Sequence, residues 1–242
     1  MERLDDILGY KNLKIYQNSD FFSFSLDSII LANYAHIRLR DKSIVDLCSG
    51  NGIIPLILSR RTKNHIIGVE IQDKLAKLAD KSVSYNGLSD QISIIQEDVK
   101  IFSKSHLNEF DLVLCNPPYF KVEENSTFNN SYEKTVARHE IFLSFSDLCS
   151  CAKQILKDNG NFCFVHRTDR LMEILFELKK NNLEPKKIKF IHETCENPSY
   201  LVLIEAQKCG KTGLSIEKPL IQYYSDGSMT EEYYLLQKEI MS

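Results

Sequence analysis

The sequence predicts an α/β fold: a mostly parallel sheet with one antiparallel strand and helices on both faces. Short β-branched runs alternate with amphipathic helical patterns along most of the chain. The first four strand candidates are almost continuously apolar, as parallel strands covered on both faces are. Late in the chain, two strand candidates follow each other without a helix between them, which adds a hairpin to the parallel sheet.

Seven strand candidates carry this prediction. They are Ser43–Cys48, His65–Ile71, Ile92–Gln96, Phe110–Cys115, Asn161–His166, Lys186–His192 and Tyr200–Ala206. The helix candidates are Ser28–Ile37, a helix from Ile53, Asp73–Asn86, Leu143–Lys157 and Asp169–Asn181. Strand–helix–strand alternation implies right-handed crossovers. After about Glu217 we expect a short strand, a turn at Asp226-Gly227 and a final helix capped by Ser228 or Thr230.

Size and composition fit one globular core. The chain has 242 residues, of which 43% are hydrophobic and 26% charged. No apolar run reaches the roughly 18 residues that a membrane span needs, and the acidic start at Met1–Asp6 is unlike a signal peptide. We therefore expect a cytoplasmic protein with no membrane partner. The seven cysteines form no CxxC pair, so we interpret them as reduced, mostly buried thiols with no metal site.

The net charge of −3 excludes a generally basic surface for nucleic acid but allows a local one. Basic residues gather in two places, at 167–189 and at Arg60, Arg61 and Lys63. A charge run is more often a solvated helix face, so these clusters favour RNA binding only mildly.

A glycine loop follows the first predicted strand and leads into a helix. It reads Asp46-Leu47-Cys48-Ser49-Gly50-Asn51-Gly52. Glycine lets the backbone turn tightly and approach a ligand closely. The dinucleotide fingerprint G-x-G-x-x-G would place its third glycine at Pro55, so that match fails. This disfavours an NAD-dependent oxidoreductase.

Three carboxylates stand at the ends of successive predicted strands: Asp46, Glu70 and Asp98. Asp46 can accept a hydrogen bond from a ligand ammonium, Glu70 from two ribose hydroxyls, and Asp98 from the amine of an adenine whose ring Val99 covers. A cationic, adenosine-bearing ligand suits this acidic edge, and S-adenosylmethionine (SAM) meets both requirements. The alternative for Asp98 is a simple helix cap.

The fourth predicted strand ends in Asn116-Pro117-Pro118-Tyr119. The two prolines stiffen the loop and offer no N–H, so its backbone presents acceptors. The Asn116 side-chain oxygen and the Pro117 carbonyl can converge on one planar amine, and Tyr119 can stack on a conjugated ring. This arrangement suits direct attack of an amine on the SAM methyl group. The alternative is an Asn-Pro turn that only leaves a strand.

With these motifs the chain resembles the amino-methyltransferases that carry Asn/Asp-Pro-Pro-Tyr, and among them the bacterial tRNA1(Val) (adenine(37)-N6)-methyltransferase family. The similar segments are Gln17 with Phe24–Ser28, Asp46–Gly52, Asn116–Phe120 and Ala137–Glu140. The resemblance implies the class I SAM-methyltransferase (Rossmann-like) fold, with a seven-stranded, mostly parallel sheet. It also implies methyl transfer to the N6 atom of the adenosine 3′ of the valine-tRNA anticodon.

The resemblance further implies three regions and a set of site residues. Residues 1–42 close over the cofactor site, 43–208 form the methyltransferase core, and 209–242 form a tail that packs on it. The catalytic residues are Asn116, Pro117, Pro118 and Tyr119. The cofactor contacts are Phe24, Asp27, Asp46, Cys48, Ser49, Gly50, Gly52, Glu70, Ile71, Asp98, Val99 and Asn116. The tRNA contacts are Tyr119, Phe120, Arg138 and His139.

Several alternatives stay open. The alternative for Phe24 and Asp27 is a purely structural role, as a hydrophobic plug and a helix cap. The alternative for Arg138 is an ordinary ion pair with Glu133 or Glu140. Glutamine-N5 methyltransferases of release factors share the core but carry a helical N-terminal domain, for which residues 1–42 leave little room. A guanine-N2 RNA methyltransferase and a SAM- or RNA-binding module without catalysis are further candidates. We expect a monomer.

Overall fold

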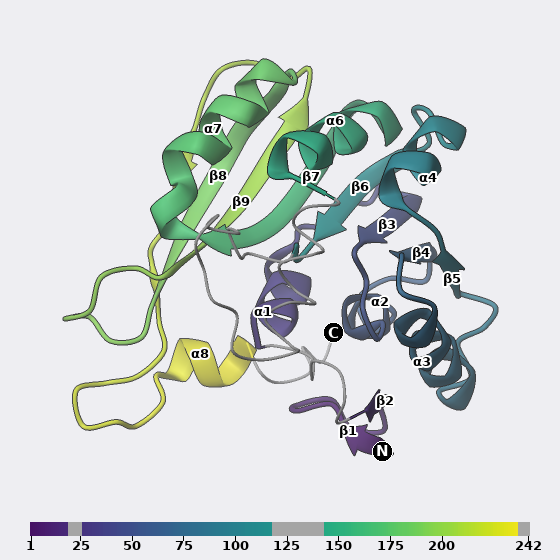
Figure 1. Cartoon of the computed structure of the whole chain (residues 1–242). Coiled ribbons are helices and arrows are strands. Elements are labelled where there is room, and N and C mark those ends of the chain that lie inside the picture. Colours follow the sequence, from purple (N-terminus) through teal and green to yellow (C-terminus); the bar gives the residue numbers. More distant parts are fainter. Residues whose placement is uncertain (19–25, 118–142, 237–242) are drawn as a thin grey trace, which may run out of the picture.

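The computed structural model describes residues 1–18, 26–117 and 143–236, and its centre is a twisted nine-stranded sheet (Figure 1). The strands are β3 (Ser43–Leu47), β4 (His65–Glu70), β5 (Ile92–Gln96), β6 (Phe110–Cys115), β7 (Leu156–Arg167), β8 (Leu183–His192), β9 (Leu201–Lys208), β10 (Ser215–Ile216) and β11 (Leu220–Ile221). Every predicted strand is present, with ends that differ by a few residues.

Seven strands lie in the order β5-β4-β3-β6-β7-β9-β8. Neighbours are parallel from β5 to β7, and β9 is antiparallel to both β7 and β8. The prediction of a mostly parallel sheet with one antiparallel strand is confirmed. The short strands β10 and β11 pair with the edge strand β8, which raises the number of strands from the predicted seven to nine.

Helices cover both faces of the sheet. One face packs on α1 (Leu26–Tyr34), α2 (Ile53–Leu58) and α3 (Asp73–Tyr85), and the other on α4 (Val99–Ser105), α6 (Phe145–Ile155) and α7 (Leu171–Lys180). Successive residues of a strand point to opposite faces. In β6, Leu112 and Leu114 therefore belong to the first core, and Val113 and Cys115 to the second. Within the described ranges, no helix is long and apolar enough to cross a membrane.

Besides β10, a hairpin and a helix were not predicted. The first is a hairpin of β1 (Glu2–Asp6) and β2 (Lys14–Asn18), which packs on α3. The Tyr16 N–H donates to the Ser82 hydroxyl at 2.9 Å, so the pairing depends on a helix far away in the chain. The second is α4, whose seven residues are too few for a periodic pattern.

The cysteines are free thiols, and four of them are buried in the cores, namely Cys115, Cys149, Cys151 and Cys163. Cys48 is half-buried, and Cys195 and Cys209 are exposed. The prediction of reduced, mostly buried thiols therefore holds for the core positions.

The C-terminal helix α8 (Glu231–Leu236) begins after Thr230, whose hydroxyl accepts the Tyr233 N–H at 3.3 Å. Thr230 is thus the predicted cap, and the turn at Asp226-Gly227 is also present. Asn33 of α1 links this helix to the start of the chain. Its amide nitrogen donates to the Leu236 carbonyl at 2.7 Å, and its oxygen accepts the Tyr10 hydroxyl at 2.7 Å.

We expect Asn33→Ala to loosen the docking of α8. The change removes one acceptor from the buried Tyr10 hydroxyl and one donor from the Leu236 carbonyl, a loss of about 1–3 kcal/mol in the free energy of unfolding. Denaturant unfolding measures the loss, and hydrogen exchange locates it at residues 231–236. Unchanged exchange there would mean that Asn33 does not hold the helix.

Candidate functional site

Four polar residues form a row along the carboxyl edge of the sheet. Asp98 follows β5, Glu70 ends β4, Asp46 lies in β3 and Asn116 follows β6, and these four strands are neighbours in this order. Parallel strands end at the same edge, about 4.8 Å apart. The structure therefore brings the three predicted acidic positions together and sets Asn116 at the end of the row. We call these four residues the strand-end row.

The glycine loop between β3 and α2 is built from left-handed residues. Cys48, Gly50 and Gly52 have φ angles of 59°, 57° and 85°. A Cβ atom on Gly52 would lie 3.1 Å from the Cβ of Ala79, so glycine serves both the turn and the close approach of α3. Gly68 of β4 is a second tight position, because a Cβ there would lie 2.7 Å from the Ser49 hydroxyl.

Glu70 holds the loop in place. One carboxylate oxygen accepts the Gly50 N–H at 2.8 Å and the other accepts the Gln72 N–H at 2.9 Å. The side chain is 4% exposed. Each carboxylate oxygen has a second lone pair, so the same group remains able to accept ribose hydroxyls. That contact stays a prediction.

Asp46 is fully buried, and neither of its carboxylate oxygens has a hydrogen-bond partner among the described residues. Burial raises its pKa to about 8; the nearby Ser49 side chain opposes this rise, and the negative charge of Glu70 adds to it. The Ser49 hydroxyl and the Asn51 amide nitrogen are likewise buried and unpartnered in the described ranges. Buried polar atoms without partners are costly and rare in native proteins. The loop is thus suited to a polar, cationic ligand.

Asp98 caps α4, because its side chain accepts the Lys100 N–H at 2.7 Å. The cap that was the alternative interpretation is therefore present. The cap uses one carboxylate oxygen of Asp98. The contact of Asp98 with the cofactor stays a prediction. Val99 beside it is buried, while Ile71 after β4 is 38% exposed.

Asn116 is anchored by a residue that the sequence did not single out for the site. Its amide nitrogen donates to the Ser28 hydroxyl at 2.8 Å, and Ser28 is 6% exposed in the first turn of α1. Pro117 after it is buried. Ser28 ends the Phe24–Ser28 segment that carries part of the family resemblance. A serine at a helix start is common and the contact spans 88 positions, so the sequence assigned it no role in the site.

Asp27 precedes Ser28, and burial raises the pKa of its carboxyl group. It lies near Tyr200, since its charge helps to raise the pKa of the Tyr200 hydroxyl, after burial as the main cause. The remaining predicted site residues lie outside the described residues. They are Phe24, Pro118, Tyr119, Phe120, Arg138 and His139.

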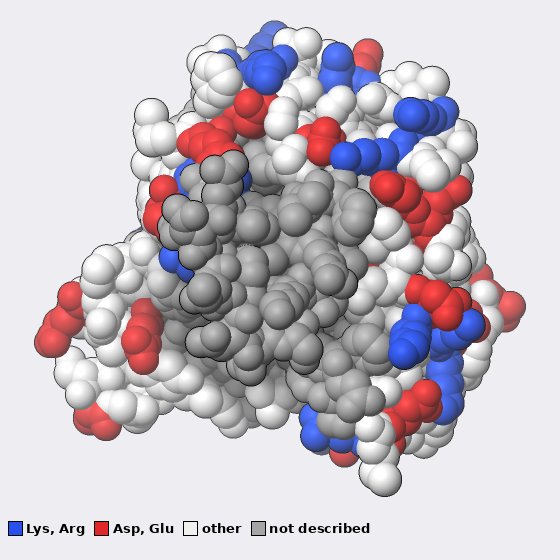
Figure 2. Space-filling view, in the orientation of Figure 1, with Lys and Arg blue, Asp and Glu red and all other residues white. Residues whose placement is uncertain are grey.

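The basic clusters are largely neutralised by neighbouring groups. Arg170 pairs with Glu173 at 2.6 Å, and Lys189 with Glu232 at 2.6 Å. Arg61 is partly buried and donates to the Ala32 carbonyl. On the described part of the face in Figure 2, the two signs of charge are interspersed. These clusters therefore add little to the case for an RNA-binding face.

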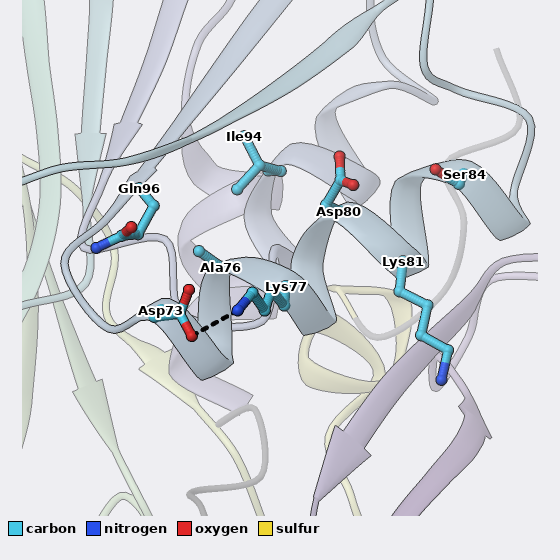
Figure 3. A pocket seen from close by; sticks show the side chains of 8 residues that line it. All are labelled: Asp73, Ala76, Lys77, Asp80, Lys81, Ser84, Ile94 and Gln96. Atoms are coloured by element: carbon cyan, nitrogen blue, oxygen red, sulfur yellow. Dashed lines mark hydrogen bonds and ion pairs between the residues drawn. The ribbon is translucent and has the colours of Figure 1, made fainter.

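A hollow of about 460 Å³ lies elsewhere, between α3 and the edge strand β5 (Figure 3). Its wall carries both signs of charge, including the ion pair of Lys77 and Asp73 at 2.8 Å. No member of the strand-end row lines it. The chemistry predicted from the sequence is therefore not located in this hollow.

A protein-family model described as "Methyltransferase small domain" matches residues 15–192. Similar curated proteins include one named tRNA1(Val) (adenine(37)-N6)-methyltransferase from Haemophilus influenzae strain PittEE. It is 28% identical over 95% of this chain and 96% of its own length. A protein of the same name from Phocaeicola vulgatus is 26% identical over 94% and 97%.

Solved structures agree on the fold. A "predicted O-methyltransferase" from Agrobacterium tumefaciens has a TM-score of 0.70 at 21% identity, over 87% of this chain and 95% of its own. Geranyl diphosphate C-methyltransferase from Streptomyces coelicolor, in complex with S-adenosyl-L-homocysteine, has a TM-score of 0.56 at 13% identity, over 76% and 77%. The class I methyltransferase fold predicted from the sequence is confirmed.

The raised pKa of Asp46 predicts how stability depends on pH. The folded protein holds the Asp46 proton more tightly than the unfolded chain does. In the unfolded chain the pKa of this aspartate has its ordinary value of 3.8. The stabilising contribution is therefore complete below about pH 4 and is lost as the pH rises towards 8. We expect Asp46→Asn, which has no proton to lose, to raise the melting temperature of the ligand-free protein at pH 8.5 more than at pH 5.

Scanning calorimetry at the two pH values measures this difference. Asp90→Asn, at an exposed aspartate, is the matched control and should leave the pH dependence as it is in the wild type. An equal shift at both pH values for Asp46→Asn would mean that this carboxyl group has an ordinary pKa.

Proposed function

Because this chain belongs to the methyltransferase small domain family, we propose that it transfers a methyl group from SAM to the exocyclic N6 of an adenine in tRNA. The Haemophilus and Phocaeicola relatives, which match nearly the whole chain, carry names that specify this reaction. The substrate we propose is accordingly the adenosine 3′ of the anticodon in valine tRNA. A tRNA substrate implies a cytoplasmic location.

The strand-end row and the glycine loop are the proposed SAM site. SAM supplies a methyl group on a positively charged sulfur, which makes it both a methyl donor and a cation. Asp46 accepts from its ammonium group, Glu70 from the ribose hydroxyls and Asp98 from the adenine amine, with Val99 and Ile71 beside the ring. The other proposed contacts are Phe24, Asp27, Cys48, Ser49, Gly50 and Gly52.

Electrostatics supports this assignment. A buried carboxyl group with a raised pKa is an unfavourable place for a negative charge until a cation lies beside it. Asp46 therefore ionises more easily with a cationic ligand than without one. Within the same site, the Glu70 carboxylate accepts two backbone N–H hydrogen bonds, which fix its position relative to the loop backbone.

The observation that carries the proposal is the anchored amide of Asn116 at the end of β6, next to the strand that bears Asp46. The Asn116 oxygen and the Pro117 carbonyl each accept one hydrogen of the substrate amine. Both bonds raise the electron density on nitrogen and aim its lone pair at the methyl group. As the bond from nitrogen to the methyl carbon forms, the bond from that carbon to sulfur breaks and S-adenosyl-L-homocysteine leaves; the excess proton then passes from nitrogen to solvent. Catalysis therefore depends on position and electrostatics.

The proposed substrate lowers the free-energy cost of bringing the base to the catalytic site. An anticodon-loop base is already unpaired, so presenting it costs less than flipping a base out of a duplex. Tyr119 is the proposed stacking surface, and Phe120, Arg138 and His139 are proposed contacts to the surrounding RNA.

Labelled SAM tests this proposal. The wild-type protein should methylate unmodified valine tRNA, and nucleoside mass spectrometry should identify N6-methyladenosine. Valine tRNA in which this adenosine is guanosine should accept no label. Label on a release factor and none on tRNA would instead establish the glutamine-N5 alternative.

We expect Asn116→Ala to lower the methyl-transfer rate by about 10²-fold or more, because it removes the acceptor that polarises the amine. The affinity for SAM should stay within about threefold, since the three carboxylates remain. Single-turnover kinetics and calorimetric titration with SAM measure the two quantities. A parallel loss of both would point to a folding defect.

A substitution at Asp98 can distinguish its role as the cap of α4 from its proposed role in cofactor binding. Serine is as good a helix cap as aspartate, but its single hydroxyl oxygen is used by the cap, whereas aspartate has a second oxygen for a ligand. We expect Asp98→Ser to weaken SAM binding by about tenfold and to leave the melting temperature of the ligand-free protein within a few degrees of wild type. If SAM binds equally well to this variant, Asp98 is only the cap of α4.

A further inference from the structure

Ser28 and Asn116 are in direct contact, although neither the motif nor the sequence spacing connects them. The Ser28 hydroxyl accepts a hydrogen bond from the Asn116 amide nitrogen at 2.8 Å. Ser28 is 6% exposed. Its helix α1 lies on the same face of the sheet as the Asn116 side chain, since Leu112 and Leu114 of β6 pack towards that face.

We propose that Ser28 is a positioning residue that sets which end of the Asn116 amide meets the substrate. This inference rests on the proposed function. An asparagine amide has a donor end and an acceptor end, and its last torsion angle has two broad, nearly equivalent minima. A half-turn would present N–H donors to the hydrogens of the substrate amine. The bond to Ser28 uses the nitrogen and so turns the oxygen away from α1.

The helix that carries Ser28 is itself held firmly. The Arg61 guanidinium donates to the carbonyl of Ala32, and Asn33 bonds to both the Tyr10 hydroxyl and the Leu236 carbonyl. These contacts come from the segment after α2, the N-terminal segment and α8. Ser28 is therefore a fixed acceptor on a braced helix, which is what the orientation of a neighbouring amide requires.

This role also concerns the class of substrate. With its oxygen presented, the Asn116 amide accepts from a group that carries N–H hydrogens, such as the exocyclic amine of adenine. The same oxygen repels a carbonyl at that position, as in guanine or hypoxanthine. Ser28 thus favours an amine as the group that is methylated.

The test compares Ser28→Ala with Ser82→Ala. Ser82 is a matched control: a buried helical serine that accepts one N–H bond, from Tyr16 at 2.9 Å, on a helix that does not carry the motif. We expect Ser28→Ala to lower the single-turnover rate by about tenfold. Its dissociation constants for SAM and for valine tRNA should stay within about twofold. Ser82→Ala should keep the wild-type rate.

A second readout does not depend on turnover. In ¹⁵N-labelled protein, the side-chain NH₂ signals of Asn116 are identified by their loss in Asn116→Ala. They should shift in Ser28→Ala and stay in place in Ser82→Ala.

Three results would overturn the inference: a wild-type rate in Ser28→Ala, a loss of SAM affinity as large as the loss of rate, or unmoved Asn116 signals. Failure of the wild-type protein to methylate tRNA would instead refute the proposed function. The Asn116 signals would then still decide whether Ser28 holds the amide.

Discussion

A buried carboxyl group near the end of a parallel strand governs the chemistry of this site. Asp46 lies in β3, between β4 and β6, and is fully buried. A charge in such a place needs a compensating partner, and neither carboxylate oxygen of Asp46 has a hydrogen-bond partner among the described residues. Glu70 ends one neighbouring strand and Asn116 follows the other, and a cationic cofactor is the kind of ligand that suits this position.

The sheet provides the rigidity that this arrangement requires. Two separate cores pack on its faces, so β3 and β6 are covered on both sides and their ends are fixed relative to each other. The loops that follow these strands can then differ in chemistry. The glycine loop presents polar atoms, and the segment after β6 presents Asn116. The helix α1 connects the two regions, because it packs on α2 and also contacts Asn116 through Ser28.

The elements that the sequence did not predict are all short, namely β1, β2, α4 and β10. The β1–β2 hairpin is stabilised by contacts with α3, including the bond from Tyr16 to Ser82. Short strands carry a weak local pattern, so distant contacts decide their conformation. The basic cluster at 167–189 is conspicuous in the sequence but less so in the structure. Acidic neighbours such as Glu173 and Glu232 form ion pairs with it and neutralise much of its charge.

The amino-acid sequence was enough to predict the seven strands β3 to β9, their direction and the residues at their carboxyl ends, because apolar runs, glycine and proline act locally. Asp46, Glu70, Asp98 and Asn116 could all be named in this way. The folded structure was needed to show their distant contacts: Glu70 holds the Gly50 loop and Asn116 bonds to Ser28. The cap that Asp98 forms on α4 is a local contact, which the sequence had already offered as an alternative. Contacts between side chains far apart in the chain arise from packing in three dimensions, and no local pattern encodes them.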